Sequence, residues 1–287
     1  MIELTIDKSY LDGIYGMSCI ENYFLYVLKA NRYPFQYLYY NSFLSFGEIV
    51  CAFVNKEMRY EYFDKIPRLQ NVALNNSLIQ MNVYKQKEFS SLLFDCDYNF
   101  VQIKSDYVNK KYNKQFWRND HYILLAPSNE TNFVYLNDNP RDHGNISLNE
   151  LKYAYDGTVI GINILSDINE ELKTTFLKDF KNSVITSDIC RIDDLDICDI
   201  YSARDILGVH RIVQKRICEF CSLYENMCLC AEHIIELDKY YSAIEYMRMR
   251  NRVDYDKIRK NFRDVLKKDD EIRQQLINKV EVYYRGK

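Results

Sequence analysis

The sequence predicts an α+β protein with an all-helical C-terminal portion, and two observations lead to this expectation. Residues 1–165 combine helix signals with short apolar runs that have the length and composition of strands. Residues 166–287 show almost only helical spacing, with apolar residues three or four positions apart. We therefore expect two domains that meet near residue 165 and pack against each other.

The first helix is expected directly after Ser18, because Ser18 and Glu21 form an S-x-x-E capping box. Pro34 would end this helix near Asn31. A second short helix is expected over Tyr37–Leu44. The apolar positions of the first helix are Ile20, Phe24, Val27 and Leu28.

Strands are expected where apolar, aromatic or β-branched residues form short runs between polar segments. The expected strands are Ile49–Val54, Arg59–Phe63, Phe100–Lys104, His121–Ala126, Phe133–Asp138 and Val159–Leu165. A polar loop separates the fourth from the fifth, which predicts an antiparallel hairpin.

The C-terminal portion is expected to begin with a capping box formed by Asp167 and Glu170. One long helix should follow, with its apolar stripe at Val213, Ile217, Phe220, Tyr224, Met227, Ala231 and Ile234. One or two further helices are expected from Tyr255, Ile258, Phe262, Val265, Ile272, Leu276 and Val280.

The composition excludes several classes of protein. Apolar residues make up 47% of the 287 residues, which is enough to bury a core. The net charge of −3 argues against nucleic acid as a bulk partner, and no glycine-rich phosphate loop is found. Neither a secretory signal nor an apolar run long enough to span a bilayer is found, so we expect a cytoplasmic protein without a membrane partner. The nine cysteines are expected to be reduced.

Cys19 would be the first residue of the helix that Ser18 caps. The N–H groups and the positive dipole end of a helix start lower the pKa of a thiol and can hold an oxyanion. For a lone cysteine the commoner alternative is a small buried residue without a chemical role.

His121 begins one strand of the expected hairpin, and Asp138 ends the other. If Ala126 lies opposite Phe133, the same register places His121 directly across from Asp138. A carboxylate in that position would orient the imidazole and fix its tautomer. A slip of one residue would break the pairing, and a structural His–Asp contact is the alternative. With Cys19, these residues predict a Cys–His–Asp triad for attack on a carbonyl.

Several stretches resemble known enzymes. Cys19 at the head of SCIENYFLYVLKANRYPF is similar to the nucleophile helix of papain-like cysteine peptidases. Over roughly residues 15–160 the chain resembles the N-terminal domain of the butirosin-pathway acyltransferase family, whose relatives trim bacteriocin leaders. The matching stretches are VQIKSDYV from residue 101, NDHYILL from 119, VYLND from 134 and ISLNEL from 146.

The resemblance implies a papain-like cysteine-protease fold over residues 1–165, with the N-terminal helix packed on an antiparallel sheet. It implies that an acyl group passes from a carrier-protein thioester through Cys19 to an amine in antibiotic biosynthesis, a diamine being one candidate. His121 and Asp138 would complete the catalytic triad. No cofactor is implied, because the phosphopantetheine belongs to the carrier protein.

Two other interpretations stay open: a leader-trimming cysteine peptidase, and a non-catalytic relative that binds a carrier or a peptide. The peptidases place a Gln before the Cys as an oxyanion donor, and the segment before Cys19 has none. Tyr15 is a weak candidate for that role, beside the backbone N–H of Cys19. Asn139 is an alternative orienter of His121.

Charged residues near the matched stretches suggest contacts with substrates. Asp106 and Glu21 are candidates for binding a cationic amine, and a basic patch would suit an acidic carrier. In each case a solvated charge is the alternative. The basic residues closest to His121 are Lys110, Lys111, Lys114 and Arg118.

A cysteine-rich segment must be weighed as a zinc site. We expect no metal there, because four ligands on one continuous helix cannot converge on an ion. The residues concerned are Cys218, Cys221, Cys228, Cys230 and His233.

Overall fold

The chain divides into two compact units. The computed structural model describes residues 8–54, 63, 65–90, 96–113, 121–127, 131–186, 199–224 and 232–285. The first unit comprises Met1–Pro34 and Leu69–Asp167, and the second comprises Phe35–Arg68 and Ile168–Lys287. The sequence predicted one domain over residues 1–165, whereas the structure groups the segment Phe35–Arg68 with the C-terminal helices.

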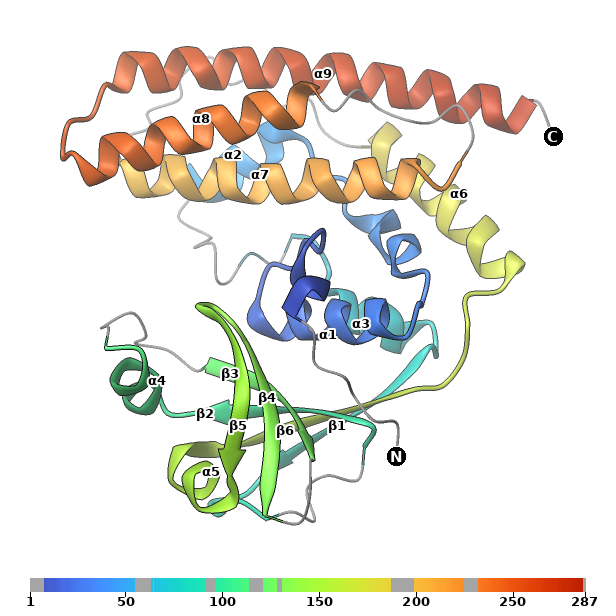
Figure 1. The fold of residues 1–287 in the computed structure, drawn as a ribbon. Helices are drawn as coiled ribbons and strands as arrows, with labels where there is room; N and C mark the ends of the chain where they lie inside the picture. Colours follow the sequence, from blue (N-terminus) through green and yellow to red (C-terminus); the bar gives the residue numbers. More distant parts are fainter. Residues whose placement is uncertain are drawn as a thin grey trace. The chain divides into compact units, whose positions relative to one another are not determined.

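The first unit is built on a six-stranded antiparallel sheet in the order β1-β6-β2-β3-β4-β5 (Figure 1). Its strands are β1 (Ile79–Lys85), β2 (Tyr98–Ile103), β3 (His121–Pro127), β4 (Asn132–Asp138), β5 (Arg141–Ser147) and β6 (Tyr155–Ile164). The sheet and its helices confirm the predicted α+β class. Four expected strands correspond to β2, β3, β4 and β6, whereas the edge strands β1 and β5 were not predicted.

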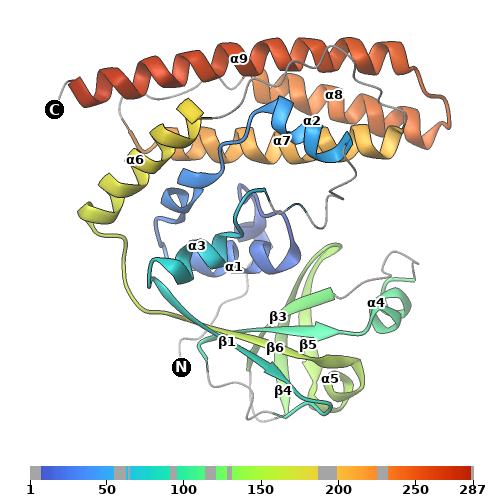
Figure 2. The ribbon, with the colours of Figure 1, turned by 180° about the vertical axis from the view of Figure 1, so that it is seen from behind.

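The helices of the first unit lie on both faces of the sheet. They are η1 (Lys8–Leu11), α1 (Cys19–Ala30), α3 (Leu69–Asn75), α4 (Ser105–Lys111) and α5 (Leu148–Ala154). In both views α1 and α3 lie on one side of the strands and α4 and α5 on the other (Figures 1 and 2). The sheet is therefore covered on each face.

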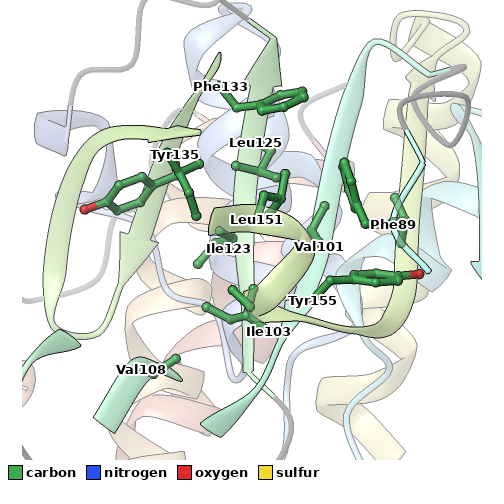
Figure 3. Close-up of a cluster of buried hydrophobic side chains, with 13 residues drawn as sticks. Phe89, Val101, Ile103, Val108, Ile123, Leu125, Phe133, Tyr135, Leu151 and Tyr155 are labelled. Atoms are coloured by element: carbon green, nitrogen blue, oxygen red, sulfur yellow. The ribbon is translucent and has the colours of Figure 1, made fainter. Parts of the chain in front are cut away.

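The face under α4 and α5 carries a buried apolar cluster (Figure 3). Alternate residues of β2, β3 and β4 point into it, because successive side chains of a strand face opposite ways. Val108 of α4 and Leu151 of α5 close it. The strand residues at its centre are Val101, Ile103, Ile123, Leu125, Phe133 and Tyr135.

The second unit is helical, in agreement with the expectation for the C-terminal portion. Its elements are η2 (Phe35–Asn41), α2 (Phe46–Val54), α6 (Glu170–Thr186), α7 (Ile200–Cys221), α8 (Glu232–Met249) and α9 (Tyr255–Arg285). Helices α7, α8 and α9 run side by side in both views (Figures 1 and 2). The Phe46 ring packs edge-on against Phe262 with ring centroids 5.2 Å apart, which anchors α2 on α9.

The predicted strand Ile49–Val54 is wrong, because this segment belongs to helix α2. A second capping box starts the helix: the Ser45 hydroxyl accepts from the Glu48 N–H at 3.2 Å, and the Glu48 carboxylate accepts from the Ser45 N–H at 2.9 Å. The expected helix Tyr37–Leu44 is the shorter 3₁₀ helix η2. Apart from Phe63, the expected strand Arg59–Phe63 lies outside the described residues.

Two further helix predictions need correction. Helix α6 begins after Asn169, whose side chain accepts from the Leu172 N–H at 2.9 Å, so Asp167 is not its cap. The expected single helix through residues 213–234 is wrong, because α7 ends at Cys221 and α8 begins at Glu232.

The break between α7 and α8 removes the argument used against a metal at the cysteine-rich segment. Cys228 and Cys230 lie outside the described residues, and within the described part of the chain no group of three or more His, Cys, Asp or Glu side chains is arranged to hold a metal ion. Cys51 is disulfide-bonded, so the expectation that all thiols are reduced is wrong.

Candidate active site

Cys19 is the first residue of α1, as the capping box predicted. The Ser18 hydroxyl accepts a hydrogen bond from the Glu21 N–H at 3.2 Å, which ends the extended segment before the helix. Cys19 is half-buried. Its thiol therefore stands at the positive end of the helix dipole and keeps part of its surface exposed.

Glu21 holds this helix start in place and does not face a substrate. Its carboxylate is fully buried and accepts backbone hydrogen bonds from Met17 at 2.6 Å and Leu69 at 2.8 Å. This geometry does not support the predicted contact of Glu21 with a cationic amine, because the side chain has no exposed surface and a backbone N–H bonds each of its oxygens. These bonds fix the segment before Cys19 and the start of α3 against α1.

The surroundings of Cys19 raise the pKa of its thiol to about 12. Burial is the largest cause, and the nearby Asp138 carboxylate is the next. Backbone hydrogen bonds at Tyr122, Ile20 and Cys19 itself favour the thiolate but do not outweigh these effects. The expected lowering of this pKa is therefore wrong, and the resting residue is a neutral thiol with backbone N–H groups around its sulfur.

The β3–β4 hairpin has a different register from the one assumed. Ala126 lies opposite Val134, one residue further along than predicted. Because side chains alternate between the two faces of a sheet, this slip moves Asp138 off the face that carries His121. Asn137 takes its place on that face.

The direct partner of His121 is Asn137. Nε2 of the imidazole lies 2.6 Å from Oδ1 of Asn137, and both side chains are buried. The Asn137 amide nitrogen donates to the Pro140 carbonyl at 3.0 Å and to the Tyr112 hydroxyl at 3.3 Å. Because a carbonyl only accepts, the nitrogen must face Pro140 and the amide oxygen must face the imidazole. Nε2 therefore carries a proton, and Nδ1 is the basic ring nitrogen.

The imidazole of His121 is neutral at neutral pH. Burial lowers the pKa of His121, while Asn137 and Asp138 oppose this shift. A neutral imidazole is the form that accepts a proton. The Cys19 sulfur lies against the backbone of Tyr122, the residue after His121. Thiol and imidazole are therefore at the same end of β3. His121 shares its face with Ile123 under α4 and α5, so the imidazole would meet the thiol on α1 around the end of the strand (Figure 1).

Asp138 lies beside Cys19 and not in hydrogen-bond contact with the imidazole. Its carboxylate accepts from the Asn22 amide at 2.9 Å, and the Tyr23 hydroxyl oxygen lies 3.1 Å from its Oδ1. Both groups come from α1, and both are uncharged. The predicted role of Asp138 as the orienter of His121 is not what this geometry offers, because Asp138 acts on the imidazole through its charge.

The weaker candidates are spread over the first unit. Tyr15 is half-buried in the segment that leads into α1. Asp106 is exposed in the first turn of α4, across the sheet from α1, so its position does not support contact with a substrate on Cys19. Asn139 is exposed in the turn after β4.

Two of the four basic residues proposed for carrier docking are described. Lys110 is exposed at the end of α4. The Lys111 ammonium lies 3.9 Å from the centre of the Tyr135 ring, and burial lowers its pKa. A docking role for Lys111 would have to break this contact. Lys114 and Arg118 lie outside the described residues.

Sequence reasoning missed two residues that organise the site. Asn137 shares a face with His121 only in the true register, and the loop between the strands does not reveal that register. Tyr23 follows Cys19 by four positions and therefore lies on the same side of α1. That spacing was the available signal for Tyr23.

The described helices include none that is both long and apolar enough to cross a membrane. No model of a known protein family matches the chain, and no curated protein matches it either. The function is therefore inferred from the site and from the resemblance of the motifs.

Proposed function

We propose that the protein is a cysteine-dependent acyltransferase that forms an amide bond. The proposal rests on one observation: the imidazole that Asn137 orients belongs to His121, and the Cys19 sulfur lies against the next residue of the same strand. A thiol, an imidazole of fixed tautomer and N–H groups around the sulfur are what nucleophilic acyl transfer requires. A papain-like arrangement of α1 on the sheet is part of this proposal.

In the first step, Nδ1 of His121 takes the thiol proton while Sγ of Cys19 attacks the carbonyl of a carrier-bound thioester. The bond to the phosphopantetheine sulfur breaks, and that sulfur receives the proton from the imidazole. The acyl group remains on Cys19 as a new thioester. The backbone N–H groups of Cys19 and Ile20, which favour the thiolate form of Cys19, would hold the oxyanion.

In the second step, an amine attacks the Cys19 thioester and leaves as an amide. His121 takes a proton from the amine and returns one to the sulfur, so the thiol is regenerated without a cofactor. The Asp138 carboxylate favours a cationic acceptor, because it lies beside Cys19 and the groups of α1 next to it are uncharged. A diamine acceptor and a role in antibiotic biosynthesis come from the resemblance of the motifs.

The carrier is expected to be acidic, and among the described residues the exposed Lys110 at the end of α4 is the candidate for docking it. Because α4 lies across the sheet from α1, the phosphopantetheine arm would have to span that distance to reach Cys19 (Figures 1 and 2). Such a carrier would meet the protein in the cytoplasm. Replacing Lys110 by Glu should then weaken carrier binding and leave reaction with small thioesters unchanged.

Intact-mass spectrometry tests the proposal. Incubation with an acyl-loaded carrier and no amine should add the mass of the acyl group to the wild type but not to Cys19→Ala. Cys96→Ala is the matched control, because it removes a buried thiol just before β2. A diamine should then release the acyl group as an amide. An adduct that persists in Cys19→Ala refutes the proposal, and carrier-independent cleavage of peptides would identify a peptidase.

A further inference from the structure

The sheet splits between β3 and β4 at the end where the site lies. The ladder between these strands extends to the pair Leu124–Leu136, and the same register would then join Tyr122 to Asp138. Beyond Leu124 and Leu136 the two strands no longer pair with each other. At this end β3 pairs with β2 as far as His121, and β4 pairs with β5 to its last residue. The ends of β3 and β4 therefore stand apart.

The hydroxyl of Tyr23 fills this split. It donates to the Tyr122 carbonyl at 2.8 Å and accepts from the Asp138 N–H at 3.0 Å. A carbonyl and an N–H that face each other across two strands would bond directly in a closed ladder. The phenol oxygen therefore bonds both backbone groups and keeps them apart.

Tyr23 is held rigidly by α1. Its side chain has no exposed surface, and its ring packs against Phe100 with centroids 5.8 Å apart. It lies one helical turn after Cys19 on the same side of the helix. The helix that carries the thiol therefore also carries the group that separates the two strands.

The imidazole and its amide partner bridge the same split. His121 comes from β3 and Asn137 from β4, and their 2.6 Å contact joins the two strand ends. The separation of the strands determines whether this contact forms. It also determines where the Tyr122 backbone meets the Cys19 sulfur.

We infer that Tyr23 is a positioning residue whose hydroxyl sets the separation of β3 and β4 at the site. The inference rests on the proposed function, in which Cys19 is the nucleophile and His121 the base. Tyr23 itself does not touch the reacting atoms. Without its hydroxyl, the strands either close their ladder or lose the bridge between the Tyr122 carbonyl and the Asp138 N–H, and both outcomes displace the imidazole.

Comparison of Tyr23→Phe with Tyr98→Phe tests this inference. Tyr98 is also buried, and its hydroxyl accepts from Asn31 at 2.6 Å, so the control loses one hydrogen bond away from the split. The readouts are the rate of Cys19 acylation by a small thioester as a function of pH, and the ¹⁵N shifts of the His121 ring. Tyr23→Phe should slow acylation roughly 10- to 100-fold and shift the ring signals, whereas Tyr98→Phe should change neither.

The inference is overturned if the folded Tyr23→Phe variant matches Tyr98→Phe in both readouts. If Tyr23→Phe does not fold, 3-fluorotyrosine at position 23 replaces it. Its ¹⁹F signal should move when His121 titrates and when Cys19 is alkylated, and an unmoved signal overturns the inference. The ring shifts need no substrate. Failure of the wild type to form an acyl adduct would therefore refute the proposed function, whereas the ring shifts would still test the role of Tyr23.

Discussion

Replacing Asn137 by alanine should disable the site, whereas replacing Asp138 by asparagine should not. Asn137→Ala removes the oxygen that accepts the hydrogen bond from Nε2–H of His121 at 2.6 Å. Asp138→Asn keeps the size of the side chain and removes its charge, and it leaves one oxygen in place of the two that face the Asn22 amide and the Tyr23 hydroxyl. Asn137→Ala therefore tests the orientation of the imidazole, and Asp138→Asn tests the effect of the Asp138 charge on the Cys19 thiol.

The expected magnitudes follow from the contacts of each residue. A hydrogen bond worth about 1.4 kcal/mol favours the Nε2–H tautomer roughly tenfold, so its loss alone costs about a factor of two in rate. An imidazole that is no longer held costs more, roughly 10- to 100-fold. Asn137→Ala removes the hydrogen bonds to the buried His121 ring and to the Pro140 carbonyl, which should lower the free energy of unfolding by about 2–4 kcal/mol. In Asp138→Asn the pKa of Cys19 should fall, and each 1 kcal/mol of lost repulsion raises the thiolate fraction about fivefold.

The assay is the rate at which a small thioester acylates Cys19 at a pH near 8, with urea unfolding as the check on stability. Asn137→Ala should be slow and less stable, and Asp138→Asn should react at least as fast as the wild type. The opposite result, with Asp138→Asn disabled and Asn137→Ala unaffected, would make Asp138 the orienter and refute the assignment of Asn137.

Four further predictions concern stability. Burial lowers the pKa of His210 and of His233, the latter to about 4. Below pH 6.5 the unfolded chain therefore binds more protons than the folded one. The helical unit should lose stability as the pH falls toward 4. Burial raises the pKa of Asp269 to about 7, which works in the opposite direction, so Asp269→Asn should steepen this loss in urea unfolding at several pH values. Glu21→Ala leaves two backbone N–H groups without their acceptor, and its free energy of unfolding should fall by about 2–4 kcal/mol in the same assay. Ser45→Ala removes the cap of α2 and should cost about 1 kcal/mol, and a loss below about 0.3 kcal/mol would contradict the capping role.

The elements with strong local signals were predictable. The Ser18–Glu21 box placed the start of α1 at Cys19, because one side chain satisfies a backbone donor that the helix leaves open. The same signal was present at Ser45 and Glu48 but was outweighed by the apolar run after it. Ile49, Val50, Ala52 and Phe53 of that run are all buried in the helical unit, so its composition did not distinguish a strand from a helix.

The candidate site was predictable only in part. Cys19 and His121 could be chosen as candidates, because the sequence places Cys19 at the start of a helix and His121 at the start of a strand. The partner of His121 depends on a register that differs by one residue, and a slip of one exchanges Asp138 for Asn137. The high pKa of the Cys19 thiol depends on Asp138 and on burial by distant parts of the chain, which a sequence pattern does not contain.

The most direct test of the central claim, that His121 acts as the base for Cys19, is the pH dependence of Cys19 acylation from about pH 6 to about pH 10 in the wild type and in His121→Ala. Because the pKa of the thiol is raised to about 12, unassisted attack should accelerate about tenfold per pH unit across this range. Attack assisted by an imidazole whose pKa is lowered from 6.5 should be nearly constant above neutral pH. We predict a flat profile for the wild type and a rising, much slower one for His121→Ala. Identical rising profiles in the two proteins would contradict the account.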